Sequence, residues 1–124
     1  MLKRLLDSVI LIDHFNNISK ATDFILGLDP SKTAISVISR AEILVGFDEE
    51  NIDKAKSLLD QYALLTIEKD TADTAAELRS MYGWKLPDAF QAALAKNKGI
   101  KFSTRNTKDF DPIQHSFVEI PYQL

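Results

Sequence analysis

Short apolar runs alternate along this chain with longer segments in which apolar residues recur at helical spacing. Leu5 and Leu6 form a flat apolar run that ends at Asp7, a pattern typical of a buried strand. Four later runs also read as strands because they are short and rich in β-branched or apolar residues: 34–38, 64–67, 100–103 and, more weakly, 117–120. The segments between these runs predict helices over about 19–27, 39–46, 48–62, 71–82 and 87–99.

The last of these helices has a clear start and a clear core face. Pro87 suits its first turn and Gly99 ends it. The residues expected to contact the core are Leu86, Ala89, Phe90, Ala93 and Leu94.

Strands that alternate with helices are typical of an α/β fold with a parallel sheet. We therefore expect a central, mainly parallel β-sheet of four to five strands flanked by helices on both faces. A length of 124 residues, without a linker or a repeat, fits a single domain over 1–124.

Composition narrows the chemistry. The net charge of −3 offers no basic coat for nucleic acid, so an anionic partner needs a local basic patch or bridging cations. The chain has no cysteine and only two histidines, which excludes thiol catalysis and Cys-ligated zinc. A bound metal would therefore be held by oxygen, which favours Mg²⁺ or Mn²⁺. No run approaches the roughly 18 apolar residues of a membrane span, and we expect a cytoplasmic protein.

Polar residues follow the predicted strands in four places. Asp7 ends the first strand, Glu42 is expected in the first turn of the helix after the second, and Asp88 lies in the first turn of the last helix. Asn106 lies in the polar segment 103–111 after the fourth strand. Each also has a purely structural interpretation, since residues 39–42 fit a capping box, Asp88 suits a helix N-terminus and Asn106 suits a turn.

Taken together, these positions indicate one site. The carboxyl ends of parallel strands meet at one edge of the sheet, where ligands bind in open α/β folds. Three carboxylates in one place cannot all stay ionised without a counter-charge. A divalent cation with oxygen ligands would supply it and would favour hydrolysis of a phosphodiester by an attacking water. Phosphate contacts near this edge are expected from Arg40, Lys85, Arg105 and Lys108.

Four blocks, in this order, resemble the motifs of the PIN-domain family, and specifically of VapC-type toxin ribonucleases: Asp7–Asp13, Ile35–Gly46, Leu86–Ala95 and Ser103–Phe110. The resemblance implies a Mg²⁺- or Mn²⁺-dependent endoribonuclease that is held inactive by a cognate VapB-type antitoxin and forms a homodimer. It implies that Asp7, Glu42 and Asp88 are the metal-binding acids and that Asn106 occupies the fourth position of the site. Asp109 would assist, and Ser8 and Thr104 would line the site.

Two departures from the family pattern matter. Val9 removes one polar contact, and Asn106 is neutral, so we expect one firmly held ion and an optional second. Two alternatives stay open. A phosphatase of the haloacid dehalogenase type needs a second acid where Val9 stands, and a degenerate PIN-like binding module would bind no metal.

Overall fold

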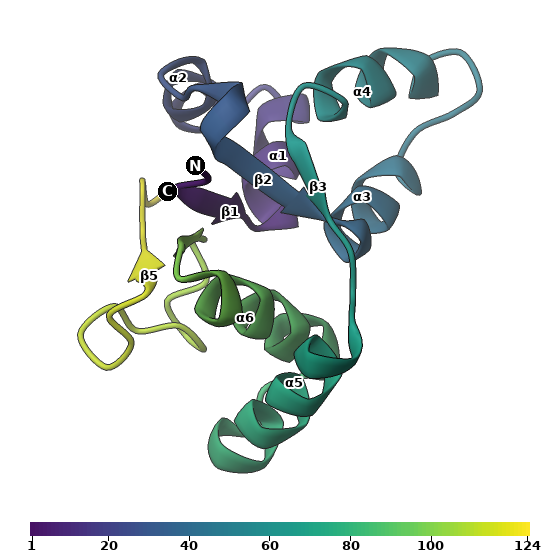
Figure 1. Ribbon diagram of the computed structural model, residues 1–124. Helices are drawn as coiled ribbons and strands as arrows, with labels where there is room; N and C mark the ends of the chain where they lie inside the picture. The colour runs from purple at the N-terminus through teal and green to yellow at the C-terminus, as the bar shows by residue number, and fades with distance from the viewer.

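A parallel sheet of five short strands runs through the middle of the molecule (Figure 1). The computed structural model describes residues 1–124. The strands lie in the order β3-β2-β1-β4-β5, and every neighbouring pair is parallel. Their bounds are Arg4–Leu6 (β1), Thr33–Ser36 (β2), Ala63–Leu65 (β3), Lys101–Ser103 (β4) and Val118–Glu119 (β5). The predicted α/β class is therefore confirmed.

Six α-helices connect and cover these strands. Their bounds are Ser8–Phe15 (α1), Ser19–Leu26 (α2), Val37–Leu44 (α3), Ile52–Leu59 (α4), Lys69–Tyr82 (α5) and Leu86–Lys98 (α6). Gly83 and Gly99 end the last two helices in the left-handed conformation, with φ of 74° and 66°. Glycine adopts this conformation without the steric penalty that a Cβ would impose.

The sheet separates two hydrophobic cores, because successive side chains of a strand point to opposite faces. Leu5 packs in the core that α5 and α6 cover, whereas Leu6 packs in the core that α1 to α4 cover. Figure 1 shows the α5–α6 pair on one side of the sheet and the other four helices on the opposite side. None of the six helices combines the length and the apolar character needed to cross a lipid bilayer.

The second strand ends earlier than its sequence pattern predicts. β2 stops at Ser36, whose hydroxyl accepts a hydrogen bond of 3.0 Å from the backbone N–H of Ser39 and so caps α3. The expected capping box from Ser39 to Glu42 is therefore wrong, and Glu42 lies in the second turn of the helix rather than the first. Val37 and Ile38 therefore form the first turn of α3, because Ser36 caps the helix earlier than the sequence pattern predicts.

Two further expectations are corrected. Residues 8–15, for which the pattern predicts no element, form α1; its Ile10 and Leu11 are fully buried, and the flat apolar run hides the helical period. Leu86 was expected in the core but is 47% exposed, because it is the first residue of α6 and projects beyond the packed part of the helix.

Candidate active site

The carboxyl ends of β1 and β4 place the candidate residues side by side. Asp7 follows β1 directly, and its backbone N–H donates to the carbonyl oxygen of Ser103 at the end of β4, at 2.9 Å. Thr104 comes next in the chain, so it lies opposite Asp7 across this pair of strands. Parallel pairing therefore brings together residues that are 97 positions apart in the sequence.

Asp7 is a buried carboxylate that its own helix does not use as a cap. It stands at the N-cap of α1 but accepts no capping hydrogen bond from that helix. Its Oδ2 accepts instead from the hydroxyl of Thr104, at 2.7 Å, and only 9% of the residue is exposed. Burial and, to a smaller extent, the negative charges of Asp88 and Glu42 together raise the pKa of Asp7 to about 6, although the hydrogen bond from Thr104 opposes the shift. A cation that binds beside Asp7 would stabilise the ionised form of its carboxyl group.

Asp88 reaches the same place from the first turn of α6. It lines, with Asp7, a hollow of about 450 Å³ at the carboxyl edge of the sheet. The other residues around this hollow are Ser8, Val9, Arg105, Asn106, Thr107 and Lys108. Partial burial raises the pKa of Asp88, as does the charge of Asp109, while Lys85 opposes the shift. Two carboxyl groups whose ionisation is disfavoured therefore line one open space.

The loop after β4 is held by its own polar side chains. The Asn106 side-chain amide donates to Asp109 Oδ2 at 3.0 Å, and its oxygen accepts from the Asp109 backbone N–H at 3.3 Å. The backbone N–H of Asn106 donates to the Thr104 hydroxyl at 3.1 Å. Since this hydroxyl also bonds Asp7, the loop and the carboxylate of β1 form one connected network.

Glu42 stands apart from the hollow. It is exposed on α3 and does not line the space between Asp7 and Asp88, although its charge acts on the Asp7 carboxyl group. No three His, Asp or Glu side chains are grouped so that they could hold a metal ion. Two carboxylates with hydroxyl and amide oxygens nearby nevertheless suit Mg²⁺, which usually keeps several waters and binds through one or two carboxylates. The donor chemistry thus fits this ion, and the three-acid site stays a prediction.

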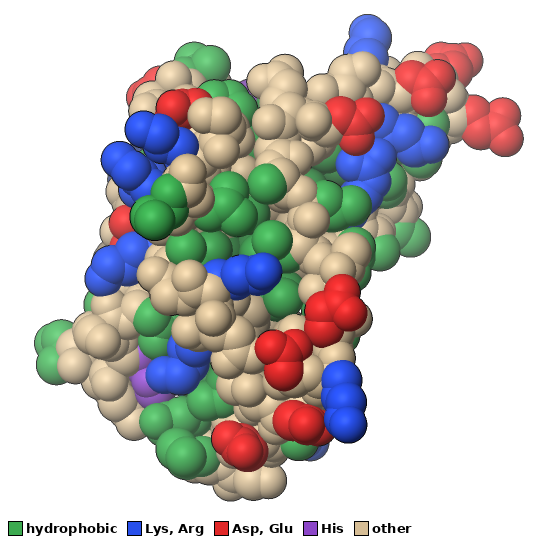
Figure 2. Space-filling view, viewed as in Figure 1, with side chains coloured by type: hydrophobic (Ala, Val, Ile, Leu, Met, Phe, Trp, Pro, Cys, Tyr) green, Lys and Arg blue, Asp and Glu red, His purple; other side chains and the backbone are tan.

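Two of the four cations expected to contact phosphate are already paired. Arg105 lines the hollow but binds the buried carboxylate of Asp13, and Arg40 binds Asp60 at 2.8 Å. Lys108 is exposed at the hollow and takes part in none of the ion pairs. In Figure 2, acidic side chains gather over α5, so the surface over this helix disfavours an anionic partner. Lys85 is also in none of the ion pairs but does not line the hollow, so Lys108 is the unpaired cation among these four that does.

Sequence reasoning missed Asp13 as a participant in this region. Asp13 is 3% exposed and accepts from Arg105 and from the Tyr122 hydroxyl, the latter at 2.8 Å. The available signal is a carboxylate that ends an otherwise apolar run, because a buried acid needs a partner.

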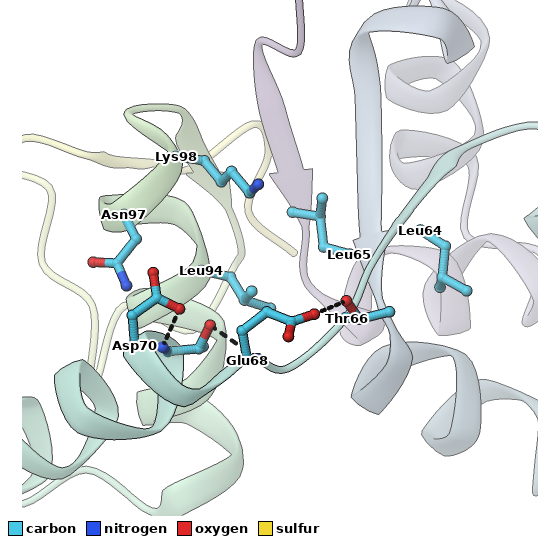
Figure 3. A pocket seen from close by; sticks show the side chains of 9 residues that line it. Leu64, Leu65, Thr66, Glu68, Asp70, Leu94, Asn97 and Lys98 are labelled. Atoms are coloured by element: carbon cyan, nitrogen blue, oxygen red, sulfur yellow. Dashed lines mark hydrogen bonds between the residues drawn. The ribbon is translucent and has the colours of Figure 1, made fainter.

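A separate hollow of about 280 Å³ lies between β3, the start of α5 and the end of α6 (Figure 3). It shares no residue with the hollow at Asp7 and Asp88. Its two acids have local partners, since Glu68 accepts from the Thr66 hydroxyl at 2.6 Å and Asp70 from the backbone N–H of Thr71 at 2.8 Å. These contacts are those of a helix start and indicate no chemistry.

The chain is similar to known proteins in sequence and in fold. The sequence profile of the PIN domain matches residues 4–115. A toxin–antitoxin complex from Klebsiella pneumoniae contains a chain that is 33% identical, with a TM-score of 0.90, over 98% of this chain and 100% of that one. No curated protein sequence matches.

More distant structures share the fold. FitAcB from Neisseria gonorrhoeae is 21% identical, with a TM-score of 0.80, over 98% of this chain and 99% of that one. VapC20 from Mycobacterium tuberculosis, a toxin that cleaves the sarcin–ricin loop, is 16% identical, with a TM-score of 0.75, over 95% of this chain and 98% of that one. The resemblance predicted from the four sequence blocks is thus confirmed in the fold.

Proposed function

This chain belongs to the PIN-domain family, and from that premise we propose that it is a metal-dependent endoribonuclease, the VapC-type toxin of a toxin–antitoxin pair. The observation that carries the proposal is the hollow that Asp7 and Asp88 both line, with the pKa of Asp7 raised to about 6. A divalent cation would offset the unfavourable ionisation of Asp7 and Asp88 at this site.

Asp7 and Asp88 would hold Mg²⁺ or Mn²⁺, with Glu42, Asn106 and Asp109 as the proposed further oxygen donors. When bound, the ion would polarise a phosphoryl oxygen and lower the pKa of a water molecule. Neighbouring polar residues hold the acidic side chains of the site in place. Thr104 fixes the Asp7 carboxylate by donating its hydroxyl proton to Oδ2, and Asn106 holds Asp109 in place.

Substrate contact is assigned to the exposed side of the hollow. Lys108, which has no ion-pair partner, would contact an RNA phosphate. Ser8 lines the same hollow, and its hydroxyl group would contact the RNA. Arg105 contributes chiefly by holding the loop, because its guanidinium is bound to Asp13.

The proposed partner is a VapB-type antitoxin. Support comes from the 33% identical relative, whose structure is a toxin–antitoxin complex, and from further relatives in VapBC complexes. A homodimer and a cytoplasmic location are proposed on the same family basis.

A non-catalytic PIN-like binding module is the second candidate. One observation favours it: no three acidic or histidine side chains are arranged as a complete metal site. Metal binding separates the two candidates, because a degenerate module has no reason to retain affinity for Mg²⁺ or Mn²⁺.

The test is cleavage of a mixed RNA pool by purified, antitoxin-free protein in Mg²⁺, in Mn²⁺ and in chelator. We expect cleavage only with metal, and its loss in a folded Asp88→Ala variant. Asp73→Ala is the matched control, since Asp73 is an exposed aspartate on α5 outside the hollow. Cleavage that persists in chelator or in Asp88→Ala would contradict the proposal.

A further inference from the structure

Three buried polar side chains lie just beyond the carboxyl end of β2. Ser36 and Ser39 are fully buried, and Gln91 is 2% exposed. The Ser36 hydroxyl accepts from the backbone N–H of Ser39, and the side-chain amide of Gln91 donates to the Ser39 hydroxyl. Burying an amide group is unfavourable unless it is hydrogen-bonded, and the bond to Ser39 offsets part of this cost for Gln91.

This hydrogen bond connects helices that belong to opposite faces of the sheet. Ser39 lies on α3, which packs on α1 and α4, whereas Gln91 lies on α6, which packs mainly on α5. The two helices also contribute to different hydrophobic cores. They can meet only past the ends of the strands, so the Ser39–Gln91 bond joins the two layers at the edge that carries the candidate site.

Each partner lies one helical turn from a predicted metal-binding acid. Glu42 is three residues after Ser39 on α3, and Asp88 is three residues before Gln91 on α6. Residues three apart on a helix are neighbours on one face, with Cβ atoms about 5–6 Å apart. The charges of both acids also reach the Asp7 carboxyl group. A shift at Ser39–Gln91 would therefore be transmitted to the spacing of Glu42 and Asp88.

The amide of Gln91 is not fully satisfied. Its Oε1 atom is buried and has no hydrogen-bond partner. The Ser39 hydroxyl can donate as well as accept, so the amide can be turned around, but one of its two ends then still lacks a protein partner. An apolar side chain would avoid this penalty, so packing alone does not account for a glutamine at this position.

We propose that Ser39 and Gln91 are positioning residues that hold α3 and α6 together at the carboxyl edge of the sheet and so set the position of Asp88 relative to Asp7 at the proposed cation site. The inference rests on the proposed function, since it concerns the same metal site. It assigns to these two residues a role in metal affinity in addition to their contribution to stability.

The test measures Mn²⁺ affinity by the electron paramagnetic resonance signal of free Mn²⁺. Ser39→Ala and Gln91→Leu are each expected to weaken Mn²⁺ binding by about tenfold, as is usual when a group supporting the ligands of a metal is removed. The double variant should be no weaker than the weaker single variant, because both changes break the same bond. RNA cleavage in Mn²⁺ should fall in parallel.

Ala93→Gly is the matched control. It lowers stability within the same helix, by about 1 kcal/mol from helix propensity alone, without touching the polar pair, so its Mn²⁺ affinity should stay at the wild-type value. Circular dichroism checks folding, and Ser39→Ala, which removes a single oxygen atom, serves if Gln91→Leu does not fold.

The outcomes separate the two proposals. A folded wild-type protein that binds no Mn²⁺ overturns the proposed function and this inference together. Wild-type protein that binds Mn²⁺ while folded Ser39→Ala binds it equally well overturns this inference alone. Equal weakening in Ala93→Gly would also overturn it, because the effect would then follow stability.

Discussion

Both carboxylate oxygens of Asp13 bind the guanidinium of Arg105, with Nε–Oδ2 at 2.6 Å and Nη2–Oδ1 at 3.0 Å. Asp13 is buried in α1, whereas Arg105 lies in the loop that lines the hollow. The Tyr122 hydroxyl donates to the same carboxylate, so α1, the loop and the C-terminal tail meet at one side chain. The hydrogen bonds from Arg105 lower the pKa of Asp13, and the acid stays ionised. The pair thus fixes the loop that carries Asn106.

Removal of the Asp13 carboxylate should destabilise the protein. Asp13→Ala leaves the Arg105 charge and the Tyr122 hydroxyl without their acceptor, and we expect a loss of about 2 kcal/mol in the free energy of unfolding. Tyr122→Phe removes a single hydrogen bond and should lower it by about 1 kcal/mol. Urea denaturation measures both values. A larger loss in Tyr122→Phe than in Asp13→Ala would show that the ion pair does not hold this region.

The stability of the metal-free protein should depend on the protonation of Asp7. Its pKa rises from the usual 3.8 to about 6 on folding, so the folded protein keeps a proton that the unfolded chain has lost. The resulting stabilisation is complete below the unfolded pKa and is lost as the pH rises through about 6, with a full size of about 3 kcal/mol.

Asp7→Asn isolates this effect, because the amide oxygen can still accept from Thr104 but cannot titrate. We expect the variant to gain stability relative to wild type between about pH 4 and pH 7 in chelator. Denaturation over this range measures the difference, and Asp73→Asn on exposed α5 provides the control. A difference between Asp7→Asn and wild type that is constant with pH would show that burial does not perturb Asp7.

RNA affinity should depend on Lys108 and not on Arg40. Lys108 lies unpaired at the hollow, whereas Arg40 is bound to Asp60 and lies outside it. In an Asp88→Ala background that leaves RNA uncut, Lys108→Ala should weaken binding and reduce the salt slope by about one. Arg40→Ala should change neither. Fluorescence anisotropy at several salt concentrations measures both, and equal effects would contradict the assigned path of the strand.

A carboxylate at position 106 should strengthen metal binding. Asn106→Asp replaces the amide donor to Asp109 with a second negative charge. Without metal, we expect a loss of about 1 kcal/mol from the missing hydrogen bond and the new repulsion. With Mn²⁺, the added oxygen ligand should raise the affinity or the number of bound ions. Calorimetric titration with Mn²⁺ measures both, and unchanged binding would show that position 106 does not contact the ion.

The periodicity of the chain was sufficient to predict the class of fold and to place two acids of the proposed site at one edge of the sheet. Short apolar runs that alternate with amphipathic segments leave few arrangements other than a parallel sheet with helices on both faces. Once that sheet is assumed, Asp7 at a strand end and Asp88 behind Pro87 must approach the same edge. Local signals such as Gly83 and Gly99 also determined where α5 and α6 end, because few other residues adopt a positive φ.

Other features depended on contacts between segments distant in sequence. The early cap at Ser36 moved Glu42 to the second turn of α3, where it is exposed and does not line the hollow. From the sequence, Arg105 is predicted to be free to contact phosphate. The structure shows instead that it is bound to Asp13, which is 92 positions away.

The sequence by itself therefore determined the fold and the proximity of Asp7 and Asp88 at the carboxyl edge, where the site is proposed, because these follow from local periodicity and strand order. Only the tertiary structure decided which charges are paired, which acids line one hollow and which buried groups lack a partner. Those properties depend on distances and desolvation between residues far apart in the chain, and a one-dimensional pattern does not contain them.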